Sequence, residues 1–172
     1  MKIINNFVTG EELDVFDRQI IPAGRWRWGQ RSNNNTLYPM WYQPYYAKGN
    51  WDEWVPQEVK QISYRFQNMY PGSKLTRAML AGNTFGQDGD IHRDWQQPGQ
   101  LTMVAYVNKE WNIHWAGETI IYSPELEILN TVRPEPGKAV IFNSDFPHIG
   151  KDPARRSGAL RCILALQIEL PT

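Results

Sequence analysis

A histidine and an aspartate separated by one residue could form half of a metal site. His92 and Asp94 stand in this order, and in an extended chain residues with this spacing point to the same side. The sequence holds three histidines in all, so few side chains could complete the site. His148 follows an apolar run that ends at Phe142, at the end of a predicted strand or in the loop beyond. We expect His148 to be the third ligand, and His114, in a predicted loop, to be structural or exposed.

Two imidazoles and one carboxylate on one side of a metal leave the other side open. This donor set is typical of non-heme Fe(II) oxygenases, whereas thiolate ligands would favour zinc or an iron–sulfur cluster. Cys162 is the one cysteine and lies in an apolar run, which indicates a buried, inert thiol. The residue types therefore favour an iron centre.

The composition restricts the remaining possibilities. A chain of 172 residues is the size of one domain, and 18 Lys plus Arg balance 18 Asp plus Glu. No net charge would recruit nucleic acid or an anionic membrane. A single cysteine fits a reducing compartment, and neither a membrane-spanning run nor a signal peptide is apparent. We expect a cytoplasmic protein with no membrane association.

The elements that must position these side chains are mostly short strands. Residues 9–21 are predicted to form a helix with a Thr9/Glu12 capping box, and a second helix starts near Pro56 and stops at Pro71-Gly72. Residues 22–54 are aromatic, irregular and strand-like. Apolar runs separated by turn signals predict strands at residues 75–80, 101–107, 118–122, 126–132, 139–142 and 160–168.

This succession predicts a mainly β fold with flanking helices, a double-stranded β-helix or jelly roll with a cupin-like core. We expect one domain over residues 1–172. Residues 1–74 would form a helical and aromatic part that covers the core, and residues 75–170 would form the β-helix itself.

The order of several motifs resembles one known family. His92-x-Asp94 is followed by residues 115–119 (WAGET), by residues 134–138 (PEPGK), by His148 and by Arg161 in the last apolar strand. This pattern is similar to that of the 2-oxoglutarate/Fe(II)-dependent oxygenases of the prolyl-4-hydroxylase-like group. The resemblance runs from about residue 77 to residue 169.

The resemblance implies iron held by His92, Asp94 and His148, with 2-oxoglutarate as cosubstrate, dioxygen as oxidant and ascorbate as a possible reductant. It also implies that Arg161 binds the distal carboxylate of 2-oxoglutarate, where prolyl hydroxylases proper use lysine. A guanidinium suits this carboxylate because it can bind both oxygens at once. Arg155 and Arg156 are rivals, but Pro153, Ser157 and Gly158 place them in a predicted solvated loop.

Other side chains have less specific predicted roles at this site. The presence of Asp94 favours hydroxylation, desaturation or cyclisation, since the halogenating branch of the family has a small residue there. Hydrogen bonds near the cosubstrate could come from Asn83, Thr84, Tyr106 and Thr119. A substrate pocket could include the aromatic side chains of Trp28, Trp41, Tyr42 and Tyr46.

The sequence therefore favours a dioxygenase that hydroxylates an unactivated C–H bond of a small molecule, such as an amino acid or a natural-product intermediate. A peptide is the alternative substrate, and nucleic acid is disfavoured by the neutral charge. Two other classes stay open: a cupin-type metalloenzyme without 2-oxoglutarate, and a tryptophan-rich β-sandwich that binds carbohydrate.

Overall fold

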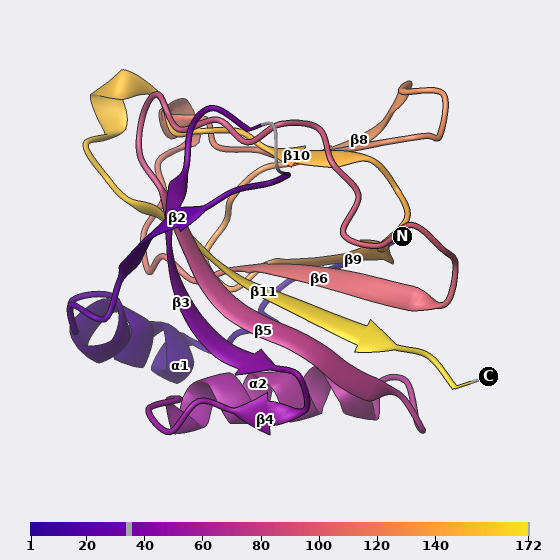
Figure 1. Ribbon diagram of the computed structural model, residues 1–172. Helices are drawn as coiled ribbons and strands as arrows, with labels where there is room; N and C mark the ends of the chain where they lie inside the picture. The colour runs from indigo at the N-terminus through magenta and orange to yellow at the C-terminus, as the bar shows by residue number, and fades with distance from the viewer. Residues whose placement is uncertain (34–35, 172) are drawn as a thin grey trace.

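Two facing β-sheets dominate the computed structural model, which describes residues 1–33 and 36–171 (Figure 1). The larger sheet has the strand order β1 (Lys2–Ile4), β9 (Ala139–Asn143), β6 (Gln100–Tyr106), β11 (Arg161–Glu169), β5 (Lys74–Asn83), β3 (Met40–Ala47) and β2 (Arg27–Gln30), with β4 (Asn50–Trp51) beside β3. The smaller sheet has the order β10 (His148–Gly150), β7 (Thr119–Tyr122) and β8 (Ile128–Val132). Every strand pair is antiparallel.

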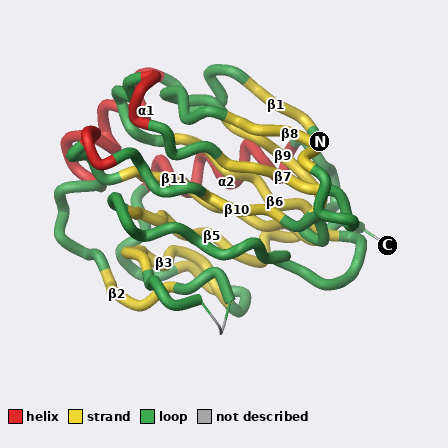
Figure 2. Tube along the Cα trace, turned by 90° about the horizontal axis from the view of Figure 1, so that it is seen from above, coloured by secondary structure: helices red, strands yellow, loops and turns green. Residues whose placement is uncertain are grey.

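Helices cover the outer face of the larger sheet, as Figures 1 and 2 show from two directions. Helix α1 (Gly10–Val15) continues into a π-helical turn, η1 (Phe16–Ile20), and helix α2 spans Gln57–Asn68. The predicted capping box is present, because Thr9 accepts a hydrogen bond from the amide of Glu12 and the Glu12 carboxylate accepts one from the amide of Thr9. Within the described part of the chain, no helix is long and apolar enough to cross a membrane.

The main core lies between these helices and the sheet. Phe16, Ile62 and Phe66 are fully buried against the outward-facing side chains of β5 and β11, among them Leu80 and Leu164. Burying each such side chain contributes about 1.5–3 kcal/mol. This packing frees the opposite, inward face of the same strands for polar residues.

The inward face of the larger sheet lines the space between the two sheets. A smaller apolar cluster, including Tyr106, Ile121 and Phe142, packs the two sheets together toward β9. Nearer the centre, alternate residues of β5 and β11 point into the space between the sheets. These are Arg77, Met79, Ala81 and Asn83 on β5, and Arg161, Ile163, Ala165 and Gln167 on β11.

Most of the predicted elements are confirmed, and the jelly-roll prediction is confirmed with them. All six predicted strands and both helices are present, although β5 starts one residue earlier and ends three residues later than expected. The prediction missed β1 and β10, which are three residues long each. The N-terminal part both covers the core through its helices and extends the larger sheet through β2 and β3. Two 3₁₀ turns, η2 (Ile113–Trp115) and η3 (Arg155–Ser157), lie in loops.

Candidate metal and cosubstrate site

The three predicted metal ligands meet between the two sheets. One ligand atom from each of His92, Asp94 and His148 can be chosen so that all lie within 4.8 Å of one another. His92 Nε2 is 3.7 Å from Asp94 Oδ1, and His148 Nε2 is 3.6 Å from Asp94 Oδ2. These distances are too long for hydrogen bonds, and they leave room for one ion between the three groups. The imidazole rings have their centroids 4.3 Å apart.

The backbone brings the two histidines together. Residues 92 and 148 form an antiparallel bridge, in which each amide donates to the other carbonyl at 3.0 and 2.9 Å. His148 is the first residue of β10, whereas His92 lies in the long β5–β6 loop, which here runs beside β10. His92 and Asp94 therefore lie outside the named strands, as the predicted strand ranges had it, and one isolated bridge holds His92 beside β10.

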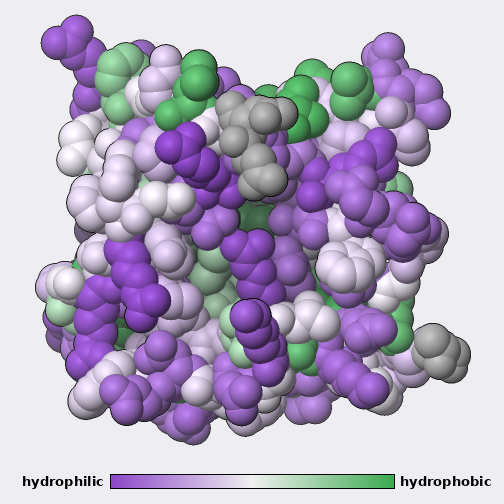
Figure 3. Space-filling model, in the orientation of Figure 1, coloured by the Kyte–Doolittle hydropathy of each residue, from purple (hydrophilic) through white to green (hydrophobic). Residues whose placement is uncertain are grey.

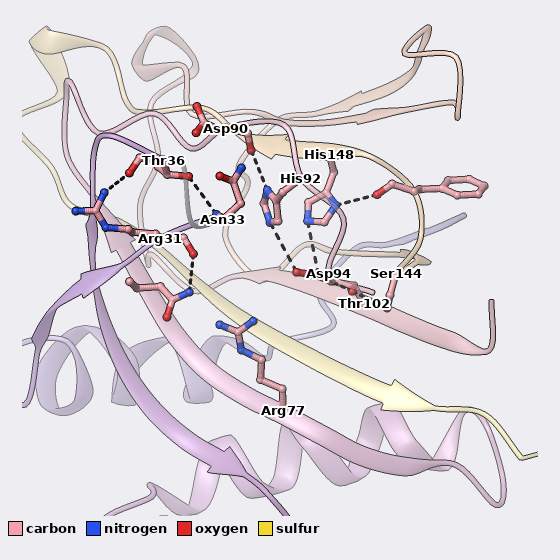
Figure 4. A network of polar contacts seen from close by, with 12 residues as sticks. Arg31, Asn33, Thr36, Arg77, Asp90, His92, Asp94, Thr102, Ser144 and His148 are labelled. Atoms are coloured by element: carbon pink, nitrogen blue, oxygen red, sulfur yellow. Dashed lines mark hydrogen bonds and ion pairs between the residues drawn. The ribbon is translucent and has the colours of Figure 1, made fainter. Parts of the chain in front are cut away.

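Hydrogen bonds orient both rings for metal binding (Figure 4). His92 Nδ1 donates to the carbonyl of Asp90 at 2.8 Å, and His148 Nδ1 donates to the carbonyl of Phe146 at 3.0 Å. A carbonyl only accepts, so each Nδ1 carries a hydrogen, and each Nε2 is the ring nitrogen that faces Asp94. Carbonyl partners of this kind are common behind metal-bound histidines. Burial lowers the pKa of His148, which keeps its ring neutral.

Asp94 is held by a short polar chain. The Thr102 hydroxyl donates to Asp94 Oδ2 at 2.7 Å and lies 2.8 Å from the Ser144 hydroxyl, which can donate to it in turn. Burial alone would raise the pKa of Asp94, but His148, His92 and the Thr102 hydrogen bond together lower it below the usual value. Asp94 is therefore an ionised ligand candidate whose Oδ1 receives no hydrogen bond from the described protein groups.

Arg161 lies in the same cavity as a buried cation. The residue is 2% exposed, and its guanidinium donates from Nε to the carbonyl of Gly117 at 2.6 Å and from Nη2 to the Thr119 hydroxyl at 3.0 Å. Among residues 1–33 and 36–171, no carboxylate forms an ion pair with it. Burial lowers the pKa of Arg161, although an arginine stays protonated at neutral pH. A buried guanidinium without a carboxylate suits an anionic ligand.

The predicted cosubstrate residues divide into two groups. Asn83 and Thr119 line the cavity beside Arg161, and Asn83 is its register partner on β5. Tyr106 stands behind them, since its hydroxyl is 2.8 Å from that of Thr119 and its ring lies under the Arg161 guanidinium at 5.6 Å. Thr84 is exposed and does not line the cavity.

The alternative arginines and the third histidine lie away from the cavity. Arg155 and Arg156 are exposed on η3, and His114 is exposed on η2. Neither arginine lines the cavity.

The predicted substrate aromatics are separated by the sheet. Tyr42 lines a groove that shares Gln30, Arg77, Met79 and Gln167 with the cavity. Tyr46 follows a register shift in β3, pairs with Ala78 and packs against the helix-side core, with its ring 4.9 Å from that of Trp51. Trp41 pairs with Gly82 on the helix-facing side of the sheet, where its ring lies 4.8 Å from that of Trp28. The structure thus brings Tyr42 near the cavity and places Tyr46 and the two tryptophans on the other side of the sheet.

Sequence reasoning missed several residues that line this cavity. Arg77 and Gln167 face it from β5 and β11, and Thr102 supports Asp94 from β6. The alternation along β5 could have identified Arg77, because it has the same parity as Asn83. Ser32 and Arg31 approach from the β2–β3 loop, and no pattern in the sequence would have indicated this contact.

The donor set fits Fe(II). Two imidazoles and an ionised carboxylate approach from one side, and the cavity continues on the other toward Arg161 and Arg77. Oxygen and nitrogen donors with open positions are what a bidentate 2-oxo acid and dioxygen require.

Comparisons with known proteins agree with this arrangement. The family model of the 2OG-Fe(II) oxygenase superfamily matches residues 78–166, slightly more than half of the chain. The chain belongs to this superfamily of 2-oxoglutarate-dependent non-heme iron dioxygenases, which use Fe(II), 2-oxoglutarate and dioxygen. A search of curated protein sequences found no match.

Solved structures of the same fold cover nearly the whole chain. A prolyl hydroxylase from Trichoplax adhaerens, in complex with a peptide fragment of hypoxia inducible factor, matches 98% of this chain and 82% of its own, with a TM-score of 0.74 and 20% identity. A Pseudomonas putida prolyl-4-hydroxylase matches 99% and 92%, with a TM-score of 0.71 and 15% identity. A non-heme α-ketoglutarate-dependent epimerase from nogalamycin biosynthesis matches 98% and 76%, with a TM-score of 0.68 and 10% identity. The neighbours thus include enzymes named for different substrates.

Proposed function

We propose that this chain, acting as one oxygenase domain, hydroxylates an unactivated C–H bond of a small molecule at the site formed by His92, Asp94 and His148. The observation that carries the proposal is the buried guanidinium of Arg161, without a carboxylate partner, in the cavity that the three ligand candidates also line. The family requires both a metal and a dianionic cosubstrate, and these residues supply one site for each.

In this proposal each side chain has a separate task. His92 Nε2, His148 Nε2 and Asp94 Oδ1 would hold Fe(II), and the carbonyls of Asp90 and Phe146 keep the two lone pairs pointed inward. Arg161 would bind the distal carboxylate of 2-oxoglutarate through its Nη atoms, because Gly117 already holds Nε. Asn83 and Thr119 would limit the sideways movement of the cosubstrate.

Bound Fe(II) supplies the activation of dioxygen that lets a C–H bond be oxidised. The overall reaction converts substrate, dioxygen and 2-oxoglutarate into hydroxylated substrate, succinate and CO₂, with one oxygen atom in each of the first two products. Apolar side chains form part of the cavity wall and limit the access of water to the site of oxidation. They are Met79, Ala81, Ile163 and Ala165. Desaturation or cyclisation would share the same first steps.

A peptidyl hydroxylase is the second candidate. The structural likeness to prolyl hydroxylases, one of them bound to a peptide, supports it, and so does the groove beside Tyr42 and Pro44 that joins the cavity. The two candidate functions differ in the substrate: a free amino acid carries its own α-amino and α-carboxylate groups, whereas a residue within a peptide does not.

Succinate release with Fe(II) and 2-oxoglutarate tests the proposal before the substrate is known, because enzymes of this class turn over slowly without substrate. His92→Ala should abolish the release, and His114→Ala, an exposed histidine, should leave it unchanged. Arg161→Lys should raise the KM for 2-oxoglutarate roughly 30-fold or more, as expected when a buried charge pair is weakened by about 2 kcal/mol or more.

Arg156→Lys is the matched control for the arginine, because it makes the same change on the exposed η3 turn. Circular dichroism would verify that each variant is folded. Unchanged succinate release in His92→Ala, or an unchanged KM in Arg161→Lys, would disprove the assignment.

A further inference from the structure

The cavity contains a second cation that the proposed reaction does not use. Arg77 lies on β5 and lines both the cavity and the adjoining groove. Figure 4 shows its side chain rising from β5 toward Asp94 and His92. Its charge contributes to lowering the pKa of Asp94, so the guanidinium is within electrostatic reach of the metal ligands.

Arg77 and Arg161 mark opposite ends of the cavity. On the paired strands β5 and β11, Arg161 is opposite Asn83, whereas Arg77 is opposite Gln167. Six residues of extended strand separate the two positions, about 20 Å along the sheet. Gln167 is in turn opposite Thr102, the residue that holds Asp94. The metal ligands therefore stand over the Arg77 half of the sheet, and a cosubstrate bound to Arg161 would approach them from the other half.

The guanidinium of Arg77 has little to bind within the protein. Its one hydrogen bond in the described chain is a weak one, from Nη2 to the thioether of Met79 at 2.8 Å. No carboxylate of residues 1–33 or 36–171 forms an ion pair with it. The residue is only partly exposed, in contrast with the exposed Lys74 on the same strand. A half-buried guanidinium with free donors favours an oxyanion as ligand.

A groove beside Arg77 could give a substrate access to the cavity from the surface. The groove beside it is formed by Tyr42, Pro44 and Gln167, and it joins the cavity at Arg77 and Met79. Figure 3 shows this face of the molecule hollowed near its centre, with hydrophilic residues around the hollow. A substrate that enters by this route meets Arg77 next to the metal ligands.

We propose that Arg77 binds a carboxylate of the substrate, and that the substrate is therefore a small organic acid, such as a free amino acid. This rests on the proposed function, because it assumes that 2-oxoglutarate occupies the Arg161 end. An internal residue of a peptide has no free α-carboxylate to place there, because this group forms a peptide bond. The bidentate contact would fix one end of the acid, so that a carbon further along it is directed to the metal side.

A role confined to the charge balance of Asp94 is the competing explanation. Loss of the charge alone would weaken acids somewhat more than amides through the electrostatic field. Arg77→Lys keeps the charge but not the planar fork, so a large loss of the acid-to-amide preference in this variant indicates direct bidentate contact.

The test uses protein loaded with Zn²⁺ and saturated with 2-oxoglutarate. Zn²⁺ has no redox chemistry, so this complex cannot turn over, and 2-oxoglutarate occupies Arg161. The probes are the twenty protein amino acids and a series of aliphatic and aromatic monocarboxylic acids, each paired with its primary amide. Glycerol 3-phosphate and proline-containing peptides form two further arms. Binding is measured by calorimetry for the parent and for Arg77→Gln, Arg77→Lys and Lys74→Gln, the last being the control on the same strand.

We expect at least one acid to bind the parent roughly 10- to 100-fold more tightly than its amide, the range of a charge-assisted hydrogen-bonded pair. Arg77→Gln should remove this preference, Arg77→Lys should retain only a small part of it, and Lys74→Gln should leave it intact. The proposal is overturned if no acid is preferred over its amide, if Arg77→Gln keeps the preference, or if only the phosphate or the peptides bind. Succinate release by the Fe(II)-loaded parent tests the proposed function separately, so a failure of one can be told from a failure of the other.

Discussion

At the scale of single residues, the group that holds a metal ligand in place also affects metal binding. Thr102 donates to the oxygen of Asp94 that faces the larger sheet, and it fixes the direction of the other. Thr102→Val keeps the shape and removes the hydrogen bond. We expect metal affinity to fall about 10- to 100-fold, as is typical when such a partner is lost. A Mn²⁺ titration measures this, with the exposed Thr131→Val as control, and equal affinities in all three proteins would contradict it.

Cys162 is an unreactive cysteine in the folded protein. Its side chain is fully buried on the helix side of β11, and burial raises the pKa of the thiol from 9.0 to about 12. The thiolate, which is the reactive form, is therefore absent from the folded protein at neutral or mildly alkaline pH. We expect a thiol reagent at pH 8 to modify the protein only after a denaturant unfolds it. Rapid modification of the folded protein would show that β11 is less well covered than described.

At the scale of elements, the turn before β7 positions Arg161. Gly117 has φ +87°, and a Cβ on it would lie 3.0 Å from Cδ of Arg161. Gly117→Ala should therefore displace the guanidinium and raise the KM for 2-oxoglutarate several-fold or more. Gly158→Ala is the control, because Gly158 also has a positive φ but has open space around it. The two variants share the backbone strain, so equal KM values would mean that the contact with Arg161 is unimportant.

The elements also show what the sequence could predict. Alternation of apolar residues located β5, β6 and β11, because their outward side chains form the core and give a clear pattern. The ligand set and Arg161 were predicted through their order along the chain, and the structure brings them to one cavity. Short strands such as β10 could not be predicted, since three residues are too few to show the alternation of apolar and polar side chains. Arg77 was missed because a charge inside an apolar run looks like a solvent-facing position until the partner sheet is known.

At the scale of the whole molecule, one bound ion would connect the two sheets. His148 belongs to the smaller sheet, and Asp94 is tied through Thr102 to the larger one. Ligands that bind only the folded state stabilise it, by about 2.7 kcal/mol at a concentration one hundred times the dissociation constant. We expect Mn²⁺ and 2-oxoglutarate to raise the unfolding temperature together by more than either does alone. In Asp94→Ala the increase due to the ion should disappear, and its persistence would place the ion elsewhere.

The backbone pairing of residues 92 and 148 affects which metal ion the site binds. Their mutual amide–carbonyl bonds come from the chain itself, so the two imidazoles keep their spacing whichever cation sits between them. Nitrogen and oxygen donors of this kind bind divalent first-row metals in a general order in which cobalt, nickel and copper bind more tightly than ferrous iron. Which of these metals the site holds therefore depends on which of them are available around the protein, and traces of nickel or copper in a preparation would act as inhibitors.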